Sequence, residues 1–267
     1  MEYVHLLKEI MREGKTISPR GQEVKEIMHV KLDVGQRCLY DFAARPLEKV
    51  WAYTQKELAW YLSGDRNSSA IVQHAKMWGE IQNPDKTVNS NYGYLVFYRR
   101  GIHPSMGTRQ VKVHPGFEWA ARSLEKDSNS RQAIITYNSG GYCFDGVLDF
   151  ICSQHQAFFI RENRLLCYIA LRSSDAIFGL AHNMPWWQLV YQMLHLRLLN
   201  TYPNLQAQHI TVDIYSAHVY ERHYELVRNM IRSKPKRLKF IVSECPPLHK
   251  SQQWYEQNLN KFVKVRK

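Results

Sequence analysis

The sequence has few cysteines, and none of them lies in a pattern typical of metal binding. Five occur in 267 residues, widely spaced and without a C-x-x-C pair: Cys38, Cys143, Cys152, Cys167 and Cys245. Zinc sites and disulfide frameworks need closely spaced or evenly paired cysteines. We therefore expect no metal and no disulfide. Most of these cysteines are expected to be small buried hydrophobic residues, which leaves one reactive thiol as an open alternative.

Long apolar runs and a leader segment are also missing. No run approaches the roughly 18 apolar residues that a membrane-spanning helix needs. The N-terminal segment MEYVHLLKEIMREGK contains acidic residues and lacks a small-residue cleavage site. We expect a cytoplasmic protein with no membrane partner.

Glycine and proline are sparse, with 13 and 10 residues, and there is no internal repeat or low-complexity linker. Hydrophobic residues make up 45% of the chain, which is enough for a sizeable core. We therefore expect a single domain over residues 1–267.

Acidic residues are outnumbered by basic ones, 24 to 36, giving a net charge of +12. A basic chain rich in tyrosine and tryptophan is typical of nucleic-acid binding. A positive cleft for small anions such as nucleotides explains the same charge. Charge alone leaves both alternatives open.

The hydrophobic periodicity predicts a mixture of helices and strands without regular alternation, so the expected class is α+β. Helices are expected over residues 2–11, 46–62, 67–78, 116–124, 184–202, 219–231 and 251–258. Pro185 suits the first turn of its helix, and Ser63-Gly64 should end the helix over 46–62. Strands are expected over 23–34, 133–137, 209–214 and 238–242, with a β-hairpin over 150–171 that turns at 161–164.

Six segments in a fixed order resemble one known superfamily, that of the thymidylate synthases and pyrimidine-nucleotide hydroxymethylases. They are SPRG (18–21), ELAWYLSGDRN (57–67), NSNYGY (89–94), NSRQAIITYN (129–138), DFICSQHQAFFIRENRLLCYIALRSSDAIFGLAHN (149–183) and SAHVYERHYE (216–225). The phrases DFIC, LRS and SAH are more similar to the bacteriophage deoxyuridylate and deoxycytidylate hydroxymethylases than to the synthases. The resemblance implies a large mixed sheet with helices packed on one face and a homodimer formed through the other.

The resemblance implies that Cys152, Glu57 and Tyr92 are catalytic. Addition of a thiolate to C6 of uracil makes C5 nucleophilic, and cysteine suits this step because its thiolate is a strong nucleophile. Arg172 would favour negative charge on that sulfur. Glu57 would organise water and carry protons around C5 and O4, and Tyr92 would assist removal of the C5 proton.

The implied nucleotide-binding residues are Arg20, Arg131, Arg172, Ser173, Asn183, His218 and Tyr220. Arginine forks suit a phosphate, and Arg131 would reach in from the partner subunit. Gln132 stands where many relatives have a second arginine. His218 and Tyr220 would hold the sugar hydroxyl. Taken singly, an arginine is more often part of a surface salt bridge.

Asn183 would select the base, because a carboxamide donates to O4 of uracil and accepts from N3–H. The cytosine-specific relatives have Asp there. Asn183 also suits an N-cap for the helix expected from residue 184.

The cosubstrate implied by the resemblance is 5,10-methylenetetrahydrofolate. Asp175 would contact it and Trp78 would pack on it, although a tryptophan such as Trp78 is equally suited to the hydrophobic core. The family's synthases close with a short apolar tail, whereas this sequence ends KFVKVRK. We therefore expect a homodimeric dUMP hydroxymethylase, and we do not expect it to bind nucleic acid. Thymidylate synthase is the first alternative and an inactive nucleic-acid-binding relative the second.

Overall fold

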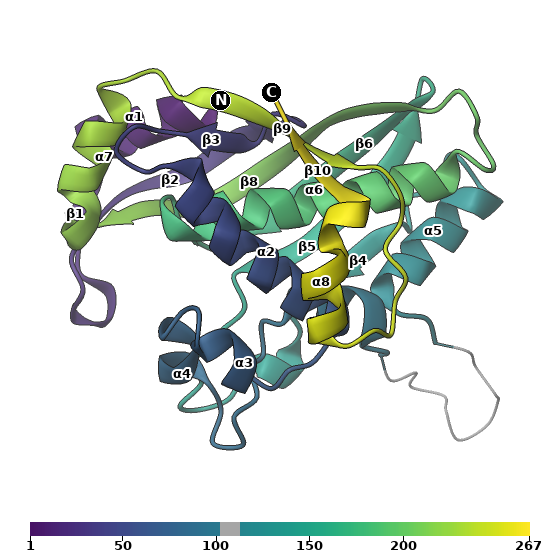
Figure 1. The fold of residues 1–267 in the computed structure, drawn as a ribbon, viewed down its shortest axis with the longest axis horizontal. Coiled ribbons are helices and arrows are strands. Elements are labelled where there is room, and N and C mark those ends of the chain that lie inside the picture. Colours follow the sequence, from purple (N-terminus) through teal and green to yellow (C-terminus); the bar gives the residue numbers. More distant parts are fainter. Residues whose placement is uncertain (102–112) are drawn as a thin grey trace.

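The structure, a computed structural model, describes residues 1–101 and 113–267 (Figure 1). Its α-helices are α1 (Tyr3–Glu13), α2 (Leu47–Ser63), α3 (Ser69–Val72), α4 (Met77–Ile81), α5 (Gly116–Lys126), α6 (Phe178–Leu198), α7 (Tyr224–Ile231) and α8 (Gln252–Phe262). Short helical turns are η1 (Pro19–Gly21), η2 (Tyr94–Tyr98), η3 (Gly140–Tyr142) and η4 (Glu221–His223).

A large mixed sheet holds most of the strands. They are β1 (Lys15–Ile17), β2 (Val24–Val34), β4 (Ile134–Thr136), β5 (Ser153–Arg161), β6 (Arg164–Leu171), β7 (Ser174–Asp175) and β8 (Gln206–Tyr220). The order is β1-β2-β8-β6-β5-β4, with β7 pairing on β8. Strands β6 and β7 run parallel to β8, and the other pairs are antiparallel. The predicted α+β class is therefore confirmed.

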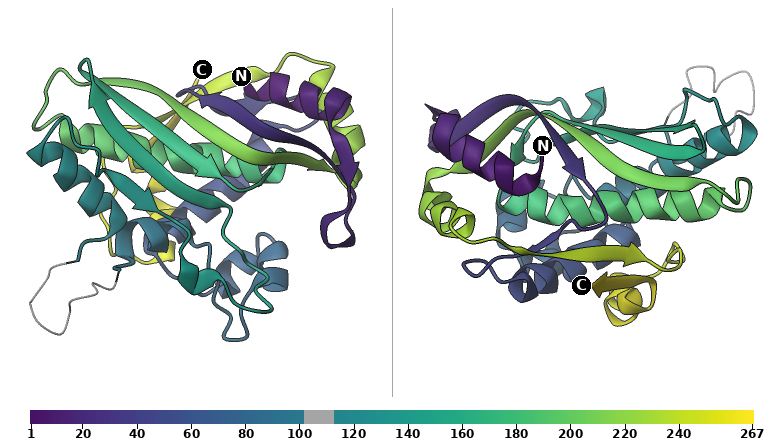
Figure 2. Two further views of the ribbon diagram at one scale, coloured as in Figure 1. Left: turned by 180° about the vertical axis from the view of Figure 1, so that it is seen from behind. Right: turned by 90° about the horizontal axis from the view of Figure 1, so that it is seen from above.

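A smaller antiparallel sheet has the order β10-β9-β3, with β3 (Leu39–Asp41), β9 (Lys236–Val242) and β10 (Val263–Arg266). Helix α6 lies between the two sheets (Figure 2, right). It is apolar on all sides, which is typical of a fully buried helix. Two of its glutamines link the layers: Gln188 donates to the carbonyl of Val34 at 2.9 Å, and Gln192 to that of Phe240 at 3.0 Å.

Two local predictions are confirmed by backbone geometry. Helix α2 ends at Gly64, which takes the left-handed conformation with φ 68° that glycine adopts without strain. The predicted hairpin forms from β5 and β6, and its turn residues Glu162 and Asn163 both have positive φ, as a tight hairpin turn requires.

Three predicted boundaries are wrong. Helix α6 begins at Phe178, so Pro185 lies well inside it rather than in the first turn. Strand β8 continues to Tyr220, and the helix expected from residue 219 begins only at Tyr224. The single helix expected over 67–78 is two short helices, α3 and α4. In each case tertiary packing overrides a local signal.

Within residues 1–101 and 113–267, no helix lies in front of the face of the large sheet opposite α6 (Figure 2, left). Exposed aromatic and apolar side chains occur on its central strands, among them Met28, Tyr168 and Tyr215. Among the described residues, no helix combines the length and apolar character needed to cross a membrane.

Candidate active site

Cys152 lies where strand β5 begins, and its sulfur faces a guanidinium and a hydroxyl. Arg172 Nη2 is 3.5 Å from the sulfur, and Ser173 Oγ is 3.9 Å from it. The pairing of β5 with β6 brings them together, and the Arg172 N–H donates to the Cys152 carbonyl at 3.0 Å. The side chain of Cys152 is only partly buried. A guanidinium at this distance would interact favourably with a thiolate, which is the form of cysteine that acts as a nucleophile.

Arg172 is held by the chain around it. Its Nε donates to the Ile151 carbonyl at 3.2 Å, and its Nη2 to the Phe150 carbonyl at 2.6 Å. Nη1 donates to Ser173 Oγ at 3.1 Å. Since a guanidinium has five N–H donors, these contacts and the sulfur occupy most of them. One N–H of Nη1 has no partner among the described residues, and a bound anion can accept from it.

Strand β8 places His218 and Tyr220 on one face, with their rings 5.2 Å apart, and pairs His218 with Asp175 of β7. Burial lowers the pKa of His218, and Asp175 opposes this change. Burial raises the pKa of Tyr220; Asp175 and Cys152 add to the rise, and Arg20 opposes it. The charges of Asp175, Cys152 and Arg20 therefore act at the same end of β8.

Arg20 lies in the turn η1 and is exposed, with φ 52° followed by Gly21 at φ 73°. A left-handed conformation costs a non-glycine residue on the order of 1 kcal/mol. Among the residues that the structure describes, the Arg20 guanidinium has no hydrogen-bond or ion-pair partner. An exposed cation in a strained turn beside Tyr220 supports a role in anion binding.

Glu57 is buried, with 5% of its surface exposed, so it is not a solvated helix glutamate. Burial raises the pKa of Glu57 to about 7, and hydrogen bonds from Tyr53 and Tyr61 oppose this rise. The Tyr53 hydroxyl is 2.9 Å from Glu57 Oε1 and receives the Trp78 Nε1–H at 2.8 Å. The carboxyl group can therefore gain and lose a proton near neutral pH.

Tyr92 lies between the Glu57 cluster and Cys152. Its ring stacks on Tyr61 with centroids 5.4 Å apart. Burial raises the pKa of Tyr92, the charge of Cys152 adds to the rise, and a hydrogen bond with Ser153 lowers it. The predicted catalytic residues Cys152, Glu57 and Tyr92 are thus connected through neighbouring side chains.

Asp149 holds the segment before η2 against the loop that leads to Cys152. Its carboxylate accepts from the backbone N–H groups of Asn89 at 2.7 Å and Ser90 at 2.8 Å, and from the Ser90 hydroxyl at 2.7 Å. Gly93 then packs on α2 so closely that a Cβ there would lie 1.5 Å from the Tyr61 carbonyl oxygen. The glycine of NSNYGY is therefore required by packing.

Asn183 lies in the second turn of α6 and is partly exposed. It is not an N-cap, because the residue before α6 is Ile177. Within residues 1–101 and 113–267, its carboxamide makes no hydrogen bond, which leaves it able to contact a ligand. Trp78 is buried, and its indole N–H donates a hydrogen bond to the Tyr53 hydroxyl. A contact between Trp78 and a folate stays a prediction.

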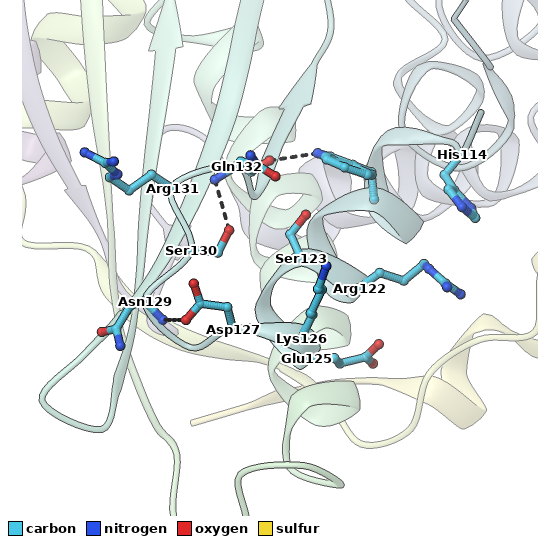
Figure 3. A pocket seen from close by; sticks show the side chains of 11 residues that line it. His114, Arg122, Ser123, Glu125, Lys126, Asp127, Asn129, Ser130, Arg131 and Gln132 are labelled. Carbon is cyan, nitrogen blue, oxygen red and sulfur yellow. Dashed lines mark hydrogen bonds between the residues drawn. The ribbon is translucent and has the colours of Figure 1, made fainter. Parts of the chain in front are cut away.

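Arg131 is separate from this cluster. It is exposed in the loop between α5 and β4, and it lines an open groove of about 1090 Å³ together with Gln132. Figure 3 shows its side chain pointing away from the α5 residues that line the same groove. No other predicted site residue lines the groove. Arg131 is therefore not brought to Cys152 within this part of the chain.

Sequence reasoning missed Tyr53, Tyr61, Asp149 and Ser153. The two tyrosines lie four residues before and after Glu57, a spacing that places side chains on one helix face and was available as a signal. Ser153 directly follows Cys152, and its buried hydroxyl lies beside Tyr92. No sequence signal marks Asp149 beyond its place in DFIC.

A partly exposed sulfur beside a fixed guanidinium, near a buried carboxyl that titrates around neutral pH, suits covalent catalysis with proton transfer. A family model described as thymidylate synthase matches residues 1–260, so the chain belongs to the thymidylate synthase family. It is a folate-dependent enzyme that transfers one carbon to C5 of a pyrimidine nucleotide.

Three curated relatives share the name deoxycytidylate 5-hydroxymethyltransferase. The chain is 27% identical to the protein of Enterobacteria phage T6 over 182 residues, which cover 66% of this chain and 69% of the relative. It is 26% identical to those of phages T4 and T2 over the same shares of each chain. This likeness falls within the superfamily predicted from the motifs.

Proposed function

We propose that this chain is a dUMP hydroxymethylase. The thiolate of Cys152 adds to C6 of the base, and C5 then attacks the one-carbon unit supplied by 5,10-methylenetetrahydrofolate. Loss of the C5 proton and release of tetrahydrofolate then leave an exocyclic methylene at C5. Addition of water to this methylene and departure of the Cys152 thiolate from C6 complete 5-hydroxymethyl-dUMP. The observation that carries this proposal is the 3.5 Å contact of Cys152 with Arg172, joined to the buried Glu57.

Asn183 supports uracil as the base, since its carboxamide, unbonded among the described residues, both donates and accepts, as O4 and N3–H require. The relatives act on deoxycytidylate by name, which makes dCMP a second candidate substrate. Glu57 supports water as the final reactant, because a carboxyl titrating near pH 7 can take a proton from it. Residues Val263–Arg266 pair with β9 in the small sheet.

Arg20, Arg172 and Ser173 are proposed to bind the phosphate, with His218 and Tyr220 on the sugar and Asp175 and Trp78 on the folate. Arg131 is proposed to come from the partner of a homodimer formed through the uncovered face of the large sheet. The exposed aromatic residues of that face support this, because such patches mark interfaces.

Incubation with 5,10-methylenetetrahydrofolate and either dUMP or dCMP, followed by product mass, tests the proposal. A hydroxymethyl product from dUMP is expected, with none from the Cys152→Ala variant. A methyl product with dihydrofolate formed would establish thymidylate synthase instead, and turnover of dCMP alone would assign the other base. Release of tritium from 5-tritiated dUMP or dCMP separates an enzyme that acts on either base from an inactive binding relative.

A further inference from the structure

The carboxyl of Glu57 has unequal neighbours on its two sides. Helix α2 carries Tyr53 four residues before it and Tyr61 four residues after it, so the three side chains follow one face of the helix. Behind Tyr53 lies Trp78 of α4, whose indole N–H is 2.8 Å from the tyrosine oxygen. The other side is different, since Tyr61 stacks on Tyr92, next to Cys152.

The directions of these hydrogen bonds are fixed by chemistry. An indole N–H only donates, so the oxygen of Tyr53 must accept from Trp78. The single hydroxyl hydrogen of Tyr53 is then free to donate to Glu57 Oε1, 2.9 Å away. With Oε1 accepting this bond, the proton of a neutral carboxyl is favoured on Oε2.

We propose that Tyr53 is a positioning residue for Glu57, which together with Trp78 commits Oε1 to accepting a hydrogen bond and leaves Oε2 to exchange protons with the substrate side. The inference rests on the proposed function for the reaction that uses these protons. Among the described residues, no indole N–H bonds to the Tyr61 hydroxyl, since those of Trp60 and Trp186 donate to other acceptors. The Tyr61 hydroxyl can accept from a protonated Oε2 as well as donate to an ionised one.

The ring of Tyr53 is itself held in place. His182 of α6 packs edge-on against it with centroids 4.7 Å apart, and its Nδ1 is 2.7 Å from Thr54 Oγ1. Burial lowers the pKa of His182 to about 3, so the ring is neutral at physiological pH. The hydroxyl of Tyr53 thus lies between a fixed donor, Trp78, and a carboxylate, with its ring packed from a third side.

Few groups other than Tyr53 affect the pKa of Glu57. The causes of the raised pKa of Glu57 are burial first, opposed by the two tyrosines. In the described part of the chain, the titratable or charged groups around Glu57 and these tyrosines come from several elements: Tyr53 and Tyr61 on α2, Tyr92 before η2, Asp149 before β5, His182 on α6, and Arg45 before α2. Loss of the Tyr53 hydroxyl should therefore be visible in the titration of Glu57.

The test compares Tyr53→Phe, Trp78→Phe and the control Tyr202→Phe. Tyr202 also loses a hydroxyl bond, to the Leu124 carbonyl at 2.7 Å, but it lies outside the site. With the donor to the charged form removed, the acid limb of the pH profile of kcat/KM should move up by about one unit in Tyr53→Phe. The KM for the nucleotide should change less than twofold. Trp78→Phe should shift the limb in the same direction by less, and Tyr202→Phe should leave it in place.

A second readout does not need turnover. The Glu57 carboxyl can be titrated by carbon-13 NMR in glutamate-labelled protein, with its signal assigned by loss in Glu57→Gln. If no wild-type turnover occurs, the proposed function fails while this titration still decides the role of Tyr53. Should Tyr53→Phe not fold, Trp78→Phe carries the test. Profiles and titrations that overlay the wild type in the folded variants would overturn the proposal.

Discussion

At the scale of single residues, burial of Glu57 sets a condition on stability. The pKa of its carboxyl is raised from 4.5 to about 7 in the folded chain. Between these two pH values the folded state binds the proton more tightly than the unfolded state. The free energy of unfolding therefore falls as pH rises through this window. This penalty, the cost of ionising a buried carboxyl, is complete above about pH 7.

Glu57→Gln should remove this penalty. The variant is expected to match the wild type near pH 5 and to exceed it at pH 8, by on the order of 3 kcal/mol. Urea unfolding at both pH values measures the difference. Glu48→Gln, an exposed change in the first turn of the same helix, is the matched control and should show no such pH-dependent gain. Equal pH slopes for Glu57→Gln and the wild type would mean that the carboxyl does not carry this cost.

At the scale of elements, the site depends on how closely the segment before η2 approaches α2. Gly93→Ala would place a methyl group 1.5 Å from the Tyr61 carbonyl oxygen, a backbone atom that cannot rotate away. We expect a loss of about 3 kcal/mol or more in the free energy of unfolding, because overpacking against backbone forces the segment apart. Chemical unfolding measures it.

Gly79→Ala in α4 is the control for this change. Its Cβ would meet Val72 Cγ1 at 3.4 Å, an ordinary contact, and alanine favours a helix over glycine. Stability should therefore stay level or rise slightly. A Gly93→Ala chain as stable as Gly79→Ala would show that the packing on Tyr61 is looser than the structure has it.

Elements with strong local signals were predictable from the sequence. Gly64 ends α2, and the turn at Glu162 and Asn163 closes the hairpin that positions Cys152 beside Arg172. The start of α6 was not predictable in this way, because Pro185 resembles a first-turn residue and only burial between two sheets favours the earlier start at Phe178. The Trp78–Tyr53 bond was also missed, since it joins residues 25 apart through tertiary packing.

At the scale of the whole molecule, the two faces of the large sheet have different surroundings. One face packs on α6, which the small sheet covers in turn, and this places Cys152, Glu57 and the β8 residues in one region. The other face carries exposed aromatic residues, and no helix of the described part of the chain lies over them. Arg131 is exposed in a loop beside the edge strand β4, away from its own Cys152 cluster. We propose that a second copy packs on the open face, which would allow Arg131 to reach the active site of its partner.

Mixing two inactive variants tests this arrangement. A mixed dimer of Cys152→Ala and Arg131→Ala contains one site with both native residues and one site with neither. After free exchange of subunits about half of the dimers are mixed, so activity should recover to roughly a quarter of the wild-type value. Native mass spectrometry of the mixture establishes that mixed dimers form. Mixed dimers without recovered turnover would place Arg131 in the site of its own chain or outside the site altogether.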